Sequence, residues 1–194
     1  MNEFSERYLE DFAVGQTFGS GRLRIDGERA LAFAAEFDPQ PFHLDEAAAR
    51  HSIFRGLTAS GWHTAAVTMR LLVETELKPA GGFVGAGLDE CRWPRPVRHG
   101  DELRVECEVI EVRPSTSRPG QGLIKLRTTT LNQDDEPVLV LVVNMIVLRR
   151  KDIRPELEAR KAARLAATSQ AAANEISPPS YEDQNGQWYD DRSG

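Results

Sequence analysis

The sequence lacks the features that mark secreted, metal-binding and membrane proteins. It contains two cysteines, Cys91 and Cys107, and their spacing fits neither a metal site nor a disulfide framework. Its longest apolar run, residues 138–143, is far too short to span a bilayer, and the first residues have no apolar signal region. We therefore expect a soluble, cytoplasmic protein that does not associate with membranes.

Positive charge is scarce as well, and it is not concentrated anywhere along the chain. Lys and Arg together number 24 against 30 Asp and Glu, so the formal net charge is −6. The longest basic run is Arg149-Arg150-Lys151. Proteins that bind nucleic acid usually carry a basic surface, so the composition argues against a nucleic-acid partner.

The length and composition indicate one domain followed by an extension. With 194 residues and 40% hydrophobic content, the chain can bury one substantial core. The patterned sequence ends near Arg150, which predicts a domain over residues 1–150 and an extension over 151–194. Within the extension, residues 155–167 have a thin apolar stripe and predict a marginal helix. The polar, Pro-containing stretch that follows predicts a flexible tail.

Most of the potential chemistry begins in a Pro-rich loop, DPQPFH, over residues 38–43. Each proline pushes the residue before it out of the helical conformation, so Asp38 and Gln40 should be extended. The stiffened loop carries a carboxylate and an imidazole, Asp38 and His43. A fully extended chain would separate them by roughly 15 Å, so a turn near Phe42 is needed before they can share a site.

Three helical segments are expected in the first half of the chain. Asp26 is a good N-cap for an amphipathic helix over residues 28–37, which ends at Asp38. Asp45 is a similar cap for a short Ala-rich helix over residues 46–51. Between Gly61 and Leu77 apolar residues cover nearly the whole circumference, which predicts a helix buried on most sides.

The rest of the pattern has the period of two that is typical of strands. A short strand is expected over residues 16–25. Further strands are expected over 83–93, 102–109, 123–131 and 138–148. Alternation within 102–109 makes Cys107 a core residue, while the last strand is apolar on both faces and should be central. One buried helix followed by antiparallel strands predicts an α+β fold with a curved sheet wrapped around the helix.

These motifs resemble the MaoC-like family of hot-dog-fold hydratases and dehydratases, which includes the (R)-specific enoyl-CoA hydratases. The family signature is Asp, a variable residue, Asn-Pro, a variable residue and His, followed by a Gly-x-x-Ala-His-Gly turn. The residues on this signature are Asp38, Pro41, His43, Gly56, Ala59 and Gly61. Gln40 replaces the usual Asn and Ser60 the usual His, and both departures bear on substrate choice. The likeness extends over about residues 8–150 and includes the segment PRPVRHGDEL.

The resemblance implies a single hot-dog domain that adds water to, or removes it from, an acyl thioester. An enoyl-CoA and 3-hydroxyacyl-CoA pair is expected, with CoA or acyl carrier protein as the thiol and no cofactor or metal. Asp38 and His43 would activate a water molecule, and the backbone N–H of Gly61 would stabilise the oxyanion at the positive end of a helix. The substrate pocket would include Gln40, Phe42, Ser60 and Trp62. Ser60 also fits the N-cap of that helix, and the family implies a homodimer.

Other interpretations stay open. A hot-dog acyl-CoA thioesterase would use a carboxylate and the same helix N-terminus to hydrolyse the thioester, and a non-catalytic binding module would turn over nothing. A metal site built from Asp38, His43, Asp45 and His51 matches no recognised spacing. His51 is expected at the surface, and His63 is expected to be a hydrogen-bonded core histidine. A basic cluster fits either CoA phosphates or a solvated face: Arg92, Arg95 and Arg98.

Overall fold

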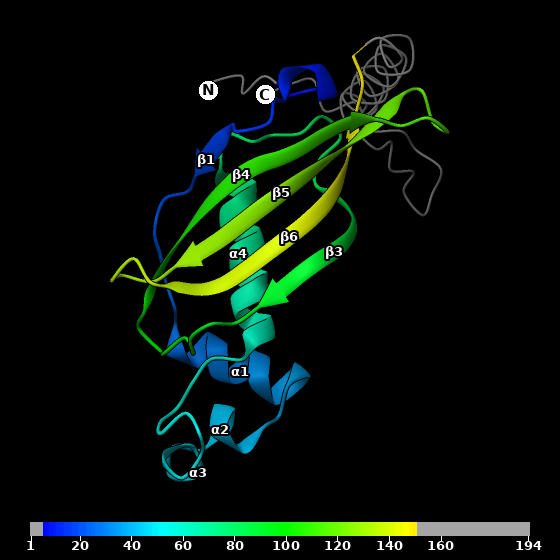
Figure 1. Ribbon diagram of the computed structural model, residues 1–194. Helices are drawn as coiled ribbons and strands as arrows, with labels where there is room; N and C mark the ends of the chain where they lie inside the picture. The colour runs from blue at the N-terminus through cyan, green and yellow to red at the C-terminus, as the bar shows by residue number, and fades with distance from the viewer. Residues whose placement is uncertain (1–5, 151–194) are drawn as a thin grey trace, which may run out of the picture. The chain divides into compact units, whose positions relative to one another are not determined.

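The computed structural model describes residues 6–150, which form one α+β domain with the hot-dog arrangement that the sequence predicts (Figure 1). The predicted extension, residues 151–194, lies outside the described residues. No helix in the described part of the chain is long and apolar enough to cross a membrane.

One antiparallel sheet forms the body of the domain. Its strands are β1 (Thr17–Gly19), β2 (Leu23–Arg24), β3 (Val84–Arg92), β4 (Glu102–Pro114), β5 (Gln121–Leu131) and β6 (Pro137–Leu148). The order across the sheet is β1-β4-β5-β6-β3, and β2 pairs with β4 beyond β1. Strand β6, which is apolar on both faces, was predicted to be central. It lies between β5 and β3 and is therefore not an edge strand, as predicted.

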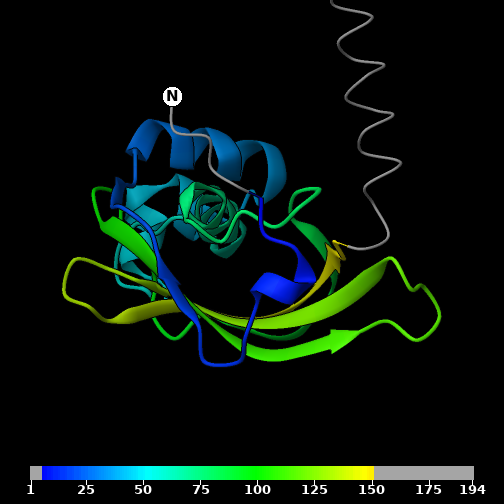
Figure 2. The same ribbon diagram turned by 90° about the horizontal axis from the view of Figure 1, so that it is seen from above.

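The helices lie on the concave side of this sheet. They are α1 (Gly27–Phe37), α2 (Pro41–Leu44), α3 (Glu46–Arg50) and α4 (Gly61–Glu74), and a short 3-10 helix spans Leu9–Asp11. Figure 2 shows α4 end-on above the curved sheet, with α1 on the side of α4 that faces away from the sheet. The predicted caps are confirmed, because Asp26 accepts from Arg29 N and Asp45 accepts from Ala48 N.

The alternating pattern of β4 explains how the core is filled. Leu103, Val105, Cys107 and Val109 all point inward and are buried. Together with residues of β5 and β6 they form the main hydrophobic cluster against α4. The prediction that Cys107 is a core residue is therefore confirmed, and burial raises the pKa of its thiol to about 11.

The strand expected over residues 16–25 is in fact two short strands. Between β1 and β2, the side chain of Ser20 takes over a ladder position, since its Oγ accepts from Val105 N at 2.8 Å. The chain then leaves the regular ladder and rejoins β4 at Leu23. A side-chain hydrogen bond thus replaces one backbone bond, which the alternation pattern could not indicate.

Two expectations for the long helix are wrong. The helix ends at Glu74 rather than Leu77, because Thr75 adopts an extended conformation and its Oγ1 donates to Leu72 O at 2.7 Å. It is also not buried on most sides: Trp62, Met69 and Val73 are exposed, Trp62 to 59%. The sheet of one chain covers only one side of α4. Apolar residues around the whole helix therefore do not mean that the whole helix is buried.

Candidate active site

The end of α1 and the one-turn helix α2 bring Asp38 and His43 together. Helix α1 ends as predicted, with Asp38 N still donating to Ala34 O. Asp38 is non-helical but not extended as expected, since its ψ is 65°. Gln40 is extended, and Pro41 begins α2, which supplies the turn required near Phe42. As a result, His43 Nε2 lies 3.3 Å from Asp38 Oδ2. The carboxylate and the imidazole are neighbours.

The backbone at Thr58 fixes the orientation of the His43 ring. His43 Nδ1 lies 2.9 Å from the carbonyl oxygen of Thr58 and 3.1 Å from its Oγ1. A carbonyl oxygen only accepts hydrogen bonds, so Nδ1 carries the proton in the neutral ring. The Nε2 lone pair then points towards Asp38. His43 is 6% exposed, so the surrounding packing holds this orientation.

Ser60 connects the Asp38–His43 pair to the start of α4. Its Oγ accepts from Trp62 N at 3.1 Å, which confirms the predicted N-cap. The same hydroxyl donates to Asp38 Oδ2 at 2.7 Å, and Ser60 is fully buried. Sequence reasoning missed this second bond, because Ser60 and Asp38 are 22 positions apart. The hydroxyl therefore orients the carboxylate as well as stabilising the helix.

A cavity of about 300 Å³ opens beside His43, between the loop that precedes α4 and the segment after β3. Its buried floor comes from His43, Thr58, Ala59, Thr64 and Val97, and its other lining residues are Phe54, Gly61, Trp93, Pro94, Arg95 and Pro96. This size is at the lower end of the range for small-molecule sites.

Gly61 lies at the first turn of α4 and lines this cavity, as its predicted role requires. The indole of Trp93 packs directly against it, with Trp93 Nε1 donating to Gly61 O at 3.0 Å. A Cβ atom at Gly61 would lie 3.0 Å from Trp93 Nε1, so a larger residue would displace the ring. Sequence reasoning placed Trp93 at a strand end and gave no signal for this contact.

The predicted pocket residues lie around the cavity rather than along its lining. Gln40 is exposed, and its N–H donates to Asp38 O at 2.7 Å. Phe42 packs edge-on against His43, with ring centroids 4.6 Å apart. Trp62 stands edge-on to Trp93 at 5.4 Å and faces outward. Gln40 and Phe42 thus contact the Asp38–His43 pair, whereas Trp62 contacts Trp93.

The other histidines stay apart from the dyad. His51 is exposed as predicted, and its Nδ1 bonds to Ala47 O of the preceding helix α3. His63 packs on Phe33, but its buried Nδ1 has no hydrogen-bond partner among residues 6–150, contrary to expectation. Burial lowers the pKa of His63 and also that of His99. Within the described residues, no three His, Cys, Asp or Glu side chains gather as a metal site would require.

The arginines of the basic cluster make different contacts. Arg98 is half-buried and donates to the carbonyl oxygens of Phe54, Gly56 and Leu57, so it holds the loop before α4 in place. Arg95 pairs with Glu136 beside the cavity. The interpretation of this cluster as a solvated face is therefore wrong for Arg98, whose guanidinium is committed to backbone carbonyls.

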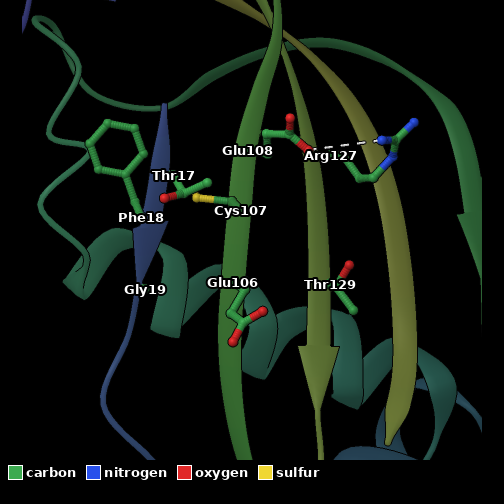
Figure 3. A pocket seen from close by; sticks show the side chains of 8 residues that line it. All are labelled: Thr17, Phe18, Gly19, Glu106, Cys107, Glu108, Arg127 and Thr129. Carbon is green, nitrogen blue, oxygen red and sulfur yellow. Dashed lines mark ion pairs between the residues drawn. The ribbon is translucent and has the colours of Figure 1, made fainter. Parts of the chain in front are cut away.

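A larger hollow, about 420 Å³, lies on the opposite face of the sheet (Figure 3). Figure 3 shows Glu106 and Glu108 on β4 and Arg127 and Thr129 on β5, with α4 behind the strands. Glu108 and Arg127 form an ion pair at 4.0 Å. This hollow has mixed charge and lacks a histidine, whereas the smaller cavity contains His43.

Comparisons with known proteins agree with this fold. Residues 11–130 match the family model of the MaoC like domain. A crystal structure of a MaoC-like dehydratase from Rhodospirillum rubrum is 54% identical, with a TM-score of 0.71, and the match covers 74% of this chain and 98% of that chain. The R-hydratase PhaJ1 from Pseudomonas aeruginosa is 26% identical, with a TM-score of 0.57, over 74% of this chain and 86% of that chain. Mesaconyl-CoA hydratase from Cereibacter sphaeroides is 29% identical over 92% of this chain, which spans 51% of that relative's length.

Proposed function

The chain belongs to the MaoC-like hydratase and dehydratase family, and we propose that it interconverts an enoyl thioester and its 3-hydroxyacyl thioester. The observation that carries the proposal is the Asp38–His43 pair, fixed by Thr58 and Ser60 beside a cavity at the start of α4. Its relatives include R-hydratase PhaJ1 and mesaconyl-CoA hydratase, whose names state hydratase activity. The thiol is CoA or acyl carrier protein.

The proton chemistry follows from the orientation of His43. With its Nδ1 proton held by Thr58 O, the neutral ring leaves Nε2, which faces Asp38 Oδ2 at 3.3 Å, free to act as the base for a water molecule shared with that carboxylate. In the hydration direction, Nε2 takes a proton from water while the water oxygen bonds to the β-carbon. The resulting imidazolium is stabilised by the Asp38 carboxylate at 3.3 Å and then gives its proton to the α-carbon. The net result is the addition of one water molecule.

The start of α4 would stabilise the negative charge that develops on the thioester oxygen. As the oxygen bonds to the β-carbon, the double-bond electrons move onto the thioester oxygen and form an enolate. The first N–H groups of a helix have no intrahelical partner and lie at its positive end. We assign the Gly61 N–H to this oxygen because Gly61 lines the same cavity as His43. Such a donor contributes on the order of 10²–10³ in rate.

A homodimer is part of the proposal. Strand β3 pairs with β6 along one side, and its other side is an open sheet edge in the described part of the chain. Two apolar side chains on this strand, Val84 and Leu88, are exposed. Exposed strand edges are usually covered or paired. We expect sedimentation analysis to give twice the mass of one chain.

The test separates hydration from hydrolysis. Addition of the protein to an enoyl-CoA should reduce the absorbance of the conjugated double bond without releasing thiol to a colorimetric reagent. Asp38→Asn and His43→Gln should each abolish most of this loss, since both keep side-chain volume and remove proton transfer. A double variant should be little worse than either single one if the residues act as a unit.

Three results would contradict the proposal. Release of thiol that depends on Asp38 would identify a thioesterase instead. Tight binding of acyl-CoA without consumption of any ester would identify a binding module. Near-normal hydration by both single variants would show that the chemistry takes place elsewhere in the protein.

A further inference from the structure

One side of the cavity is a short wall, residues 93–97, that is bonded to the loop before α4. Ala59 N donates to Val97 O at 2.9 Å, and Trp93 Nε1 donates to Gly61 O at 3.0 Å. Two prolines, at positions 94 and 96, restrict the backbone between these bonds. The wall is therefore preformed and does not need a ligand to define it.

The indole of Trp93 forms the part of the cavity lining that lies against Gly61. Ring atoms of Trp93 lie 3.0–3.4 Å from the position that a Cβ atom on Gly61 would take. Trp62 stands edge-on against the outer side of the same ring, with centroids 5.4 Å apart. An acyl chain that extended past Gly61 on this side would have to displace the indole and break its hydrogen bond to Gly61 O.

Beyond the cavity, the contact between α4 and the sheet contains a buried hydrogen bond. Thr64 lines the cavity and is buried. One turn further along α4, Thr68 Oγ1 lies 2.7 Å from Thr130 Oγ1 of β5, and both residues are buried. A long acyl chain entering between α4 and the sheet would have to separate this pair. Breaking a buried hydrogen bond without replacing it is unfavourable.

From the hydrogen-bonded indole of Trp93 and the buried Thr68–Thr130 pair we infer that the site accepts short acyl groups and that Trp93 is a specificity-determining residue. This inference rests on the proposed function, because it concerns the acyl group of the same thioester. The volume of about 300 Å³ agrees with it, since the reacting carbons and the thioester must share that space. A longer chain would need the room that the indole now occupies.

The experiment compares kcat/KM for a four-carbon and an eight-carbon enoyl-CoA in the wild type, Trp93→Ala and Trp93→Phe. The wild type should favour the four-carbon ester by about 100-fold, since single methylene groups change rates by roughly 10–200-fold. Trp93→Ala should reduce this preference at least about tenfold, and Trp93→Phe, which keeps a ring, should retain it. Trp93 is 40% exposed, so we expect all three proteins to fold, which melting temperatures will check.

A wild type that favours the eight-carbon ester, or a Trp93→Ala protein with an unchanged preference, would overturn the inference. Calorimetric binding of butyryl-CoA and octanoyl-CoA gives a readout that does not need turnover. If no enoyl ester is hydrated, the proposed function fails, yet the same shift in the ratio of Kd values between wild type and Trp93→Ala would still support the wall. An unchanged Kd ratio, or binding of neither ester, would refute it.

Discussion

Ser60→Ala tests how strongly the candidate dyad depends on the start of α4. The substitution removes a hydroxyl that makes two bonds, one from Trp62 N at 3.1 Å and one to Asp38 Oδ2 at 2.7 Å. Loss of a Ser N-cap costs about 1 kcal/mol. Loss of a hydrogen bond to a charged group costs about 2 kcal/mol. The free energy of unfolding should therefore fall by about 3 kcal/mol, or roughly 6–12 °C in Tm for a chain of this size.

Activity should fall as well, because Asp38 would lose the bond that orients its carboxylate towards His43. A loss of about 2 kcal/mol from the transition state corresponds to a fall of about 30-fold in kcat/KM. The matched control is Asp26→Ala, which removes the cap of α1 through its bond from Arg29 N. That variant should lose some stability, because the first turn of α1 loses its cap, and should keep its turnover.

The measurements are urea unfolding and enoyl-CoA hydration for both variants and for Ser60→Ala combined with Asp38→Asn. In the combined variant, Ser60→Ala should add little further loss of rate, because its effect acts through the carboxylate. Equal destabilisation by Ser60→Ala and Asp26→Ala, together with normal turnover by both, would refute the reasoning. The hydroxyl would then be a helix cap and nothing more.

Three further predictions concern other parts of the domain. Thr58→Val removes the hydroxyl near His43 Nδ1 but keeps the carbonyl, so kcat/KM should fall by less than about tenfold. Burial lowers the pKa of His63 and His99 below 6.5, so the unfolded chain binds more protons as the pH falls below that value. The Tm should therefore decrease between about pH 7 and pH 5, and less steeply in His63→Gln; an identical slope in both proteins would contradict this. With a pKa raised to about 11, the Cys107 thiol of a Cys91→Ser variant should react with a colorimetric disulfide reagent only after unfolding, and fast reaction of this variant in its native state would show that Cys107 is accessible.

The sequence alone determined the features that depend on neighbours a few positions away. Asp26 and Asp45 cap helices because a carboxylate reaches an N–H three residues ahead. Pro39 and Pro41 stop α1 and hold Gln40 extended, whatever the rest of the chain does. The alternation of β4 likewise assigned its buried face. Short-range sterics and a period of two are properties of the local chain.

The candidate dyad was located by a resemblance in sequence, but the geometry on which its proposed chemistry depends is set by the tertiary structure. The spacing of Asp38 and His43 permits separations from contact to roughly 15 Å. The turn at α2 brought them to 3.3 Å, and the carbonyl of Thr58 decided which ring nitrogen carries the proton. Neither the tautomer nor the bond from Ser60 to Asp38 has a local signal, because each joins residues 15 or more positions apart.

The covering of α4 and the wall at Trp93 were also decided by the tertiary fold alone. Apolar residues around the whole of α4 indicated burial on most sides, yet the sheet covers one side and leaves Met69 and Val73 exposed. Trp93 lies 32 positions from Gly61, and the curve of the sheet places its indole against that backbone. Hydrophobic side chains favour burial, but the tertiary fold decides which distant segment of the chain covers each of them.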